Sequence, residues 1–256
     1  PMAAAVFAME VVSVGVMYYA ALLPCVIASI IAAEFATGVG LNPETFPVAR
    51  IPQLSLESGL KMAVIAAGCG LLSILFCVAL KAVSGIYGKY LKNPYLRVCV
   101  AGCLVIGITM LLGTGDYMGA GNELIAKAVE QGKARPLDFL WKMILTAITM
   151  RAGYRGGEIV PAFSVGATFG CVAGGLLGFS PEVAAAASMV ALFCGVTNCP
   201  IASMLISFEL FGFSGAAYYL IAISISYALS GYYSLYKDQT IVYSKYKARY
   251  INKKTH

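Results

Sequence analysis

Charged residues are scarce in this 256-residue sequence, at 12%, whereas apolar residues make up 60%. The mean hydropathy is +0.81, and a soluble domain would be roughly one quarter charged. Long runs without any charged residue include residues 62–80, 98–115, 159–181, 183–208 and 210–236. Each is close to or longer than the ~18 to 20 residues that cross a hydrocarbon core as a helix. The composition therefore excludes an ordinary soluble protein and predicts a membrane protein.

Histidine is almost absent, because the one histidine is the last residue, His256. This excludes catalysis by an internal histidine and a histidine metal site. The eight cysteines form no CxxC pair and lie in or beside apolar runs, so we expect small buried side chains rather than disulfides or metal ligands. An intramembrane enzyme with Cys194 or Cys199 as nucleophile would lack a matching base. We therefore predict no enzyme, no cofactor and no metal.

Most of the net charge of +6 lies at the end of the sequence. Six cations follow the last apolar run and face only one acid, Asp238; they are Lys237, Lys245, Lys247, Arg249, Lys253 and Lys254. By the positive-inside rule, residues 237–256 form a basic cytoplasmic segment. Anionic lipid is the expected neighbour of such a segment, and no nucleic-acid partner is predicted.

Glycines recur within the apolar runs, which favours broken and re-entrant helices over simple spanning ones. We expect helices near residues 1–11, 17–35, 59–90, 95–112, 136–150, 161–178, 182–196, 200–211 and 215–234. Segment 37–58, rich in proline and polar residues, and segment 114–135 are expected to be connections outside the membrane with solvated acids. The predicted fold class is an all-α polytopic membrane protein.

An internal repeat relates the first ten residues, PMAAAVFAME, to residues 200–209, PIASMLISFE. A proline, an alanine two residues later and a glutamate nine residues later match without a gap. Chance similarity between two apolar helices is the alternative. A true repeat indicates a transporter with two homologous halves and a substrate site between them. It predicts that residues 1–94 end the first half, that residues 95–236 form the second, and that on the order of a hundred residues precede Pro1.

The stretch RGGEIVPAFSVGATFG, residues 155–170, places a lone glutamate before a long uncharged run. Two glycines allow close backbone approach, and Pro161 suits the first turn of a helix because its missing N–H would be unpaired there. The N–H groups of Glu158, Ile159 and Val160 are therefore expected at a helix N-terminus. The positive end of the helix dipole makes such a position a site for an anion.

Several segments together resemble the CLC family of chloride channels and proton-coupled anion exchangers. GEIVP at residues 157–161 is similar to the family's GxFxP loop, SVGATFG at 164–170 to its small-residue helix, TNCPIASMLISFELFG at 197–212 to its second PxxG-type helix, and IVYSK at 241–245 to the segment with its central tyrosine. The resemblance covers the chain from end to end. It implies an inverted-repeat fold that transports chloride or fluoride, as a channel or an antiporter, in a bacterial plasma membrane.

The resemblance also implies which residues contact the anion. These are the backbone of Gly157, Glu158, Ile159 and Val160, and the hydroxyl of Tyr243. The alternative for Tyr243 is an ordinary interfacial tyrosine. The family's GSGIP and GREGP loops, with an anion-binding serine and a gating glutamate, are expected upstream of residue 1.

Two acidic residues, Glu158 and Glu10, are candidates for a role in ion selectivity or proton transfer. Glu158 stands where most chloride-handling members have an apolar residue, and this is similar to the GGExTP loop of the fluoride-exporting branch. Its carboxylate tunes selectivity or shuttles a proton, or else turns away to pair with Arg151 or Arg155. Glu10 matches the first acid of a pair in proton-coupled members, with Val11 in place of the second. Glu10 therefore either serves a proton path or is only a helix-end carboxylate.

The resemblance implies a homodimer in which each protomer holds its own pore, with interface faces from residues 17–35, 59–83 and 200–233. A secondary transporter of another inverted-repeat fold, for oxyanions or organic anions, is the alternative function. A purely structural membrane scaffold would explain the apolar runs but not a glycine-flanked helix start at membrane depth.

Overall fold

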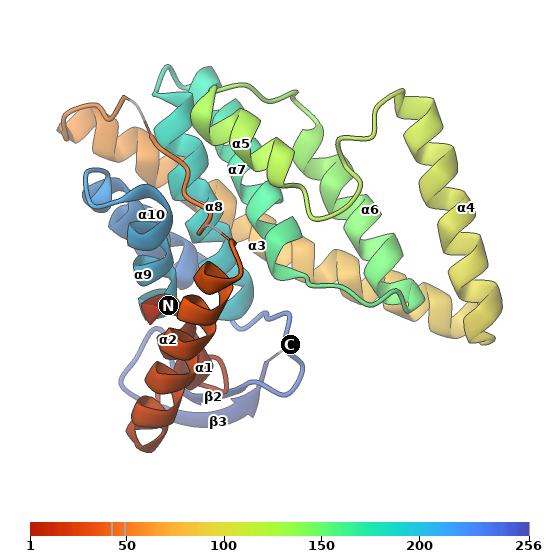
Figure 1. Ribbon diagram of the computed structural model, residues 1–256, viewed down its shortest axis with the longest axis horizontal. Coiled ribbons are helices and arrows are strands. Elements are labelled where there is room, and N and C mark those ends of the chain that lie inside the picture. Colours follow the sequence, from red (N-terminus) through yellow and green to blue (C-terminus); the bar gives the residue numbers. More distant parts are fainter. Residues whose placement is uncertain (42, 49, 256) are drawn as a thin grey trace.

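The computed structural model describes residues 1–41, 43–48 and 50–255, so His256 lies outside the described residues. Helices dominate it, with one small sheet at the end that carries the C-terminus (Figure 1). The α-helices are α1 (Met2–Glu10), α2 (Leu22–Gly38), α3 (Leu56–Tyr90), α4 (Pro94–Leu112), α5 (Asn122–Glu130), α6 (Asp138–Ala152), α7 (Ile159–Leu176), α8 (Pro181–Thr197), α9 (Pro200–Phe211) and α10 (Ala216–Leu229). A short 3-10 helix, Tyr19–Ala21, precedes α2. The strands are β1 (Ser13–Val14), β2 (Thr240–Tyr243) and β3 (Tyr250–Lys254).

The helix α8 forms the centre of the molecule. Every residue of α8 from Val183 to Thr197 is buried, and helices α3, α5, α7, α9 and α10 surround it. A helix that is apolar on all sides requires such a position, since none of its faces gains from water. The core of the protein is therefore built around a helix of 17 residues that is covered by protein rather than by lipid.

Local sequence signals explain where several helices begin and end. Ser55 and Ser58 form a capping box at the start of α3. Asn93 caps α4, Pro94 occupies its first turn, and Gly113 ends it in the left-handed conformation at φ 65°. These are the residue types that satisfy or tolerate the unpaired backbone groups of helix ends.

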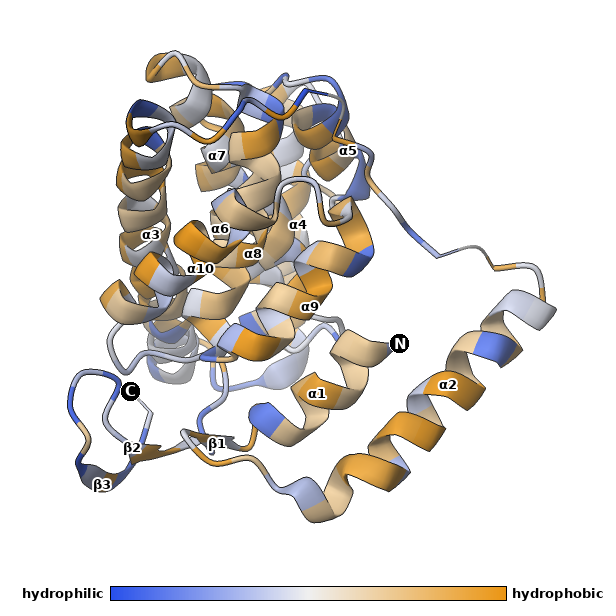
Figure 2. Ribbon diagram, turned by 90° about the vertical axis from the view of Figure 1, so that its left-hand side faces the viewer, coloured by the Kyte–Doolittle hydropathy of each residue, from blue (hydrophilic) through white to orange (hydrophobic). Residues whose placement is uncertain are grey.

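Within the described residues, four helices are long and apolar enough to cross a membrane: Tyr19–Gly38, Leu56–Tyr90, Pro94–Leu112 and Ile159–Leu176. The first, which contains α2, has no buried residue in its most apolar window and stands apart from the helix bundle (Figure 2). The fold class predicted from the sequence, an all-α polytopic membrane protein, is confirmed. Three shorter apolar helices, α8, α9 and α10, follow the last long one within the described residues, in keeping with broken helices.

The small sheet joins segments that are far apart in the sequence. Strand β1 pairs in parallel with β2, with Ser13 opposite Thr240, and β2 pairs antiparallel with β3. The C-terminal segment is thereby attached to the chain just after α1, at the end of the molecule opposite α5 (Figure 1). The sequence analysis did not predict these strands.

Two predictions were wrong: one predicted connection contains a helix, and one predicted helix is shorter than expected. Segment 114–135 was predicted to be a connection, yet it contains α5, whose residues Leu124, Ile125, Ala128 and Val129 are buried. Their spacing places them on one helix face, which packs against α7 and α8. The predicted helix 215–234 ends at Leu229, because the chain turns at Gly231, where φ is 60°.

The cysteines are all free, as predicted, but they are not all buried. Five are buried, namely Cys69, Cys77, Cys171, Cys194 and Cys199. Cys99 and Cys103 are exposed on α4, and Cys25 is half-buried on α2. All three exceptions lie on α2 or α4, two helices with almost no buried surface, so their thiols face whatever covers those helices.

Candidate functional site

The loop before α7 presents the helix N-terminus that the sequence predicted. Helix α6 ends at Gly153, whose φ of 114° turns the chain, and α7 begins at Ile159 with Glu158 as its N-cap. The Glu158 side chain makes no capping hydrogen bond. The first N–H groups of a helix have no preceding carbonyl to bind, and Pro161 removes one of them. Ile159 and Val160 are half-buried, and a Cβ atom at Gly157 would meet open space. The turn therefore holds backbone donors that have no partner within the helix.

The carboxylate of Glu158 is paired with an arginine at the end of α6. Its Oε1 atom lies 2.9 Å from Nη2 of Arg151, and the two side chains are 20% and 22% exposed. This is one of the two pairings that the sequence analysis left open. The Nε atom of Arg151 is buried without a hydrogen-bond partner. An ion pair with one unused arginine donor therefore lies beside the loop.

Close packing of α7 on α8 holds this turn in place. A Cβ atom at Gly170 would lie 2.3 Å from the carbonyl oxygen of Ala184, and one at Gly166 would lie 2.6 Å from that of Ser188. Such distances mean that the backbones touch directly. Glycines spaced four residues apart lie on one helix face, as in close helix contacts within membranes. The small-residue helix at 164–170 thus acts as a rigid support for the loop.

The structure does not join Tyr243 to this loop. Tyr243 ends strand β2, is 48% exposed, and places its ring 5.9 Å from that of Tyr250. Its Cβ atom lies 3.1 Å from where a Cβ of Gly15 would be. In the described part of the chain, no hydrogen bond links Tyr243 to residues 156–160. The contact between Tyr243 and an anion stays a prediction.

The two glutamates of the repeat cap each other's helices. Glu10, at the end of α1, accepts hydrogen bonds from the N–H groups of Ile201 at 3.1 Å and Ala202 at 2.8 Å. Glu209, in the last turn of α9, accepts them from Met2 at 2.9 Å and Ala3 at 3.4 Å. Matching residues of the two repeats therefore make matching contacts across an approximate twofold relation. This favours a true repeat and the role of Glu10 as a helix-end carboxylate.

We expect Glu10→Ala to lower the free energy of unfolding by about 1 to 3 kcal/mol, since it leaves two N–H groups of α9 without a charged acceptor. Glu209→Ala should cost less, because Glu209 is 26% exposed whereas Glu10 is 7% exposed. Thermal unfolding in detergent measures both. A Glu209→Ala variant that is the less stable of the two would contradict the assignment.

A half-buried lysine, Lys245, anchors the C-terminal segment near the end of α8. Lys245 donates to the Asn198 side chain, to the Tyr227 carbonyl at 3.2 Å and to the Ser230 hydroxyl at 3.0 Å. Asn198 holds the left-handed turn between α8 and α9, with φ 61°. It also donates to the Gln239 side chain at 2.9 Å. The sequence analysis counted Lys245 only as part of a basic tail.

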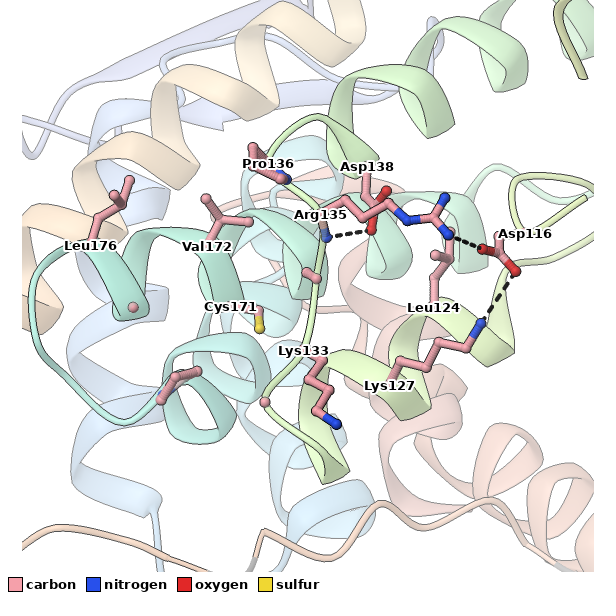
Figure 3. Close-up of a pocket in the computed structure, with 14 residues that line it drawn as sticks. Asp116, Leu124, Lys127, Lys133, Arg135, Pro136, Asp138, Cys171, Val172 and Leu176 are labelled. Carbon is pink, nitrogen blue, oxygen red and sulfur yellow. Dashed lines mark hydrogen bonds and ion pairs between the residues drawn. The ribbon is translucent and has the colours of Figure 1, made fainter. Parts of the chain in front are cut away.

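A second cluster of charges lines a cavity of about 560 Å³ between α5, the segment before α6, and α7 (Figure 3). Asp116 lies at its edge, 3.2 Å from Nζ of Lys127 and 3.6 Å from Nη2 of Arg135. Asp116 was expected to be solvated, but it is 21% exposed. A hydrogen bond with the Thr114 side chain lowers the pKa of the Asp116 carboxyl, and the charges of Lys127 and Arg135 lower this pKa further.

We expect Asp116→Asn to lower the free energy of unfolding by about 0.5 to 1 kcal/mol at neutral pH. Because the pKa of Asp116 is lowered in the folded state, its stabilisation is fully present above the unfolded pKa, ~3.9, and is lost as the pH falls through the folded value. Melting temperatures of both proteins across pH 3 to 7 measure this. A difference that grows on acidification would contradict the sign.

The chain is similar in sequence to proteins of known description. The family model described as voltage gated chloride channel matches residues 1–231. A chloride/fluoride channel protein of Pseudomonas syringae pv. tomato is 33% identical over 254 residues, which cover 96% of this chain and 56% of that protein. The H(+)/Cl(-) exchange transporter ClcA of Vibrio cholerae is 26% identical over 226 residues, 82% of this chain and 48% of that protein.

Solved structures give the same result. A CLC-type fluoride/proton antiporter superposes with a TM-score of 0.89 at 30% identity, over 93% of this chain and 60% of that one. A eukaryotic CLC transporter superposes with a TM-score of 0.64 at 20% identity, over 90% and 40%. The chain thus spans about half the length of these relatives. On the family match and the shared fold, this integral membrane protein belongs to the voltage gated chloride channel (CLC) family.

Proposed function

We propose that the protein moves a small inorganic anion, fluoride or chloride, across a membrane along a path that passes the N-terminus of α7. The single observation that supports this best is the glycine loop before α7, which is exposed at Gly157 and places the N–H groups of residues 157–160 at the start of the helix. Backbone N–H groups and the helix dipole attract an anion without a full cation that would trap it. The proposal includes the backbone of Gly157, Glu158, Ile159 and Val160 as the anion-binding groups.

Fluoride is the anion that we favour. Glu158 places a carboxylate at the loop, where it would repel a halide when ionised and would donate a hydrogen bond when protonated. Fluoride is the strongest hydrogen-bond acceptor among the halides, so a protonated carboxyl distinguishes it from chloride. Two proteins of at least 30% identity, a chloride/fluoride channel and a fluoride/proton antiporter, carry fluoride in their descriptions.

Anion efflux from liposomes tests the proposal directly. The protein expressed from its natural gene is reconstituted in liposomes loaded with fluoride and chloride, and the release of each ion is recorded with and without a pH gradient. We expect fluoride release to exceed chloride release. Release of either ion no faster than from protein-free liposomes would refute anion transport, and chloride release that exceeds fluoride release would refute the choice of ion.

Tyr243 stays within the proposal as a hydroxyl donor to the anion, although its side chain packs on Gly15 and Tyr250 here. Tyr243→Phe removes only the hydroxyl. The same efflux measurement on this variant and on Tyr246→Phe, whose hydroxyl donates to the Ala228 carbonyl at 2.7 Å, separates the two roles. Unchanged efflux in Tyr243→Phe would assign this residue to the membrane boundary.

The assembly that we propose is a homodimer with the basic C-terminal segment on the cytoplasmic side. Helix α2 supports it, because Leu23, Ile31 and Phe35 are each more than 60% exposed, and α2 packs chiefly on α1. Six cations in residues 237–254 support the orientation. The proposed location is a bacterial plasma membrane. The face that carries α5 would then lie on the side of the membrane away from the cytoplasm.

A further inference from the structure

A cavity of about 470 Å³ lies between α4, α6 and the start of α7, on the inner side of the 117–121 loop. Gly156, Gly157 and Val160 of the candidate anion loop form one side of it. Lys142 and Arg155 line it as well, and none of the described residues around it is an acid. The cavity therefore has two positive charges in its wall, next to the amides that the proposed function assigns to the anion.

Lys142 is a buried cation without an acidic partner. It is 1% exposed, and its Nζ atom donates to the carbonyl oxygens of Tyr117 at 3.0 Å and Gly119 at 2.8 Å. An ammonium has three donors, so one remains. No carboxylate within the described residues lies within 4.0 Å of it. Its charge is thus solvated by two neutral dipoles only.

The nearest acid in the sequence is already engaged. Asp138 lies one helical turn before Lys142 on α6, a spacing at which an ion pair often forms. Its carboxylate instead accepts hydrogen bonds from the Tyr117 hydroxyl at 2.7 Å and from the Arg135 N–H at 2.8 Å. The positive charge of Lys142 is therefore left to act on the cavity.

Arg155 adds a second charge from the loop side. Arg155 is exposed and makes no ion pair among the described residues. Thr146 and Thr149 direct their hydroxyl hydrogens back to the carbonyls of Lys142 and Leu145, each at 2.7 Å. The hydrogen-bond donors that remain for an anion in the cavity are therefore those of Lys142, Arg155 and the nearby backbone.

We propose that this cavity binds a halide-sized monovalent anion, as a second station beside the α7 N-terminus, with Lys142 as its buried counter-charge. A buried charge without a counter-ion costs free energy, and an anion in the adjoining cavity compensates it. The inference rests on the proposed transport of anions. It adds a second position, in which the ion is held before it reaches the amide turn or after it leaves it. Lys142 would otherwise serve only to tie the 117–119 backbone to α6.

Bromide tests this site, because it resembles chloride and scatters X-rays anomalously. Crystals of the protein grown in bromide should show an anomalous peak in this cavity, beside Lys142 and Arg155. Lys142→Met keeps most of the volume and removes the charge, so the peak should vanish and bromide affinity for this site should fall about tenfold or more. Lys133→Gln, which removes one exposed charge on the α5 face away from this cavity, should leave the peak unchanged.

Arg155→Gln keeps the test decisive if Lys142→Met does not fold, since Arg155 is exposed and its loss should weaken the peak without unfolding the protein. A wild-type cavity without bromide, or a peak that persists at full height in Lys142→Met, would overturn the proposal. The outcome is separate from that of the efflux assay. Normal efflux with an empty cavity rejects this site alone, whereas bromide in the cavity of a protein without efflux rejects the transport function alone.

Discussion

Glu158→Gln is expected to reduce the ratio of fluoride to chloride transport by about tenfold or more, and to make the remaining fluoride flux independent of a pH gradient. Glutamine keeps the size of the side chain but neither ionises nor carries a transferable proton. It also leaves the Arg151 guanidinium, now 2.9 Å from a carboxylate oxygen, without its counter-charge beside the amide turn. The local potential becomes more positive, which favours chloride as well as fluoride.

Two companion variants give this prediction a control. Glu57→Gln also breaks an ion pair with one cation, Lys61 at 2.7 Å, but on an exposed helix start away from the loop. Its ion ratio should stay that of the wild type. Arg151→Gln should alter the same ratio as Glu158→Gln, because it frees the carboxylate from its partner. If Glu158→Gln changes only the yield of folded protein, the ion pair is structural and the carboxylate has no role in selectivity.

The sequence was sufficient for the parts of the fold that depend on local chemistry. The glycine pair, Pro161 and the uncharged run located the start of α7 within two residues, because each signal concerns the backbone of that segment alone. The repeat of proline, alanine and glutamate located α1 and α9. The contact that explains the two glutamates, a reciprocal cap between helices about 200 residues apart, needed the structure.

Other features could not be read from the sequence because they depend on distant backbone atoms. Lys142 looks like any lysine in an apolar helix, yet its partners are carbonyls of a loop more than twenty residues earlier. Strand β2 pairs with Ser13–Val14, and no local alternation of side chains predicts such a short strand. The pairing of Glu158 was narrowed to Arg151 or Arg155 by proximity in sequence, and side-chain geometry selected Arg151.

Helix α5 is a different case, because its pattern was present and was missed. Its apolar residues Leu124, Ile125, Ala128 and Val129 recur at helical spacing within a segment whose glycines and charges are typical of a connection. A helix of nine residues between polar flanks gives a weak signal by composition. Its position over α7 and α8 bears on the proposed second anion site, since the preceding turn supplies the carbonyls that bind Lys142.

The close contact between α7 and α8 predicts the largest loss of stability. We expect Gly170→Ala to lower the free energy of unfolding by about 3 kcal/mol, or to prevent folding, because overpacking a tight core costs about 1 to 3 kcal/mol or more. The added methyl group would lie 2.3 Å from the Ala184 carbonyl and 2.4 Å from the Ser188 side chain. Ser188 can rotate, but a carbonyl in the middle of a fully buried helix cannot move without displacing α8.

Gly175→Ala is the matched control, since it makes the same change in the same helix. A Cβ atom there meets nothing within 4 Å, and alanine is about 1 kcal/mol more favourable than glycine in a helix, so this variant should be as stable as the wild type or slightly more so. Retention of a monodisperse peak after heating in detergent compares the three proteins. Equal losses in both variants would mean that α7 and α8 do not touch at Gly170. A loss confined to Gly170→Ala would show that the glycines of this helix fix the position of the amide turn, since any shift of α7 moves Glu158 with it.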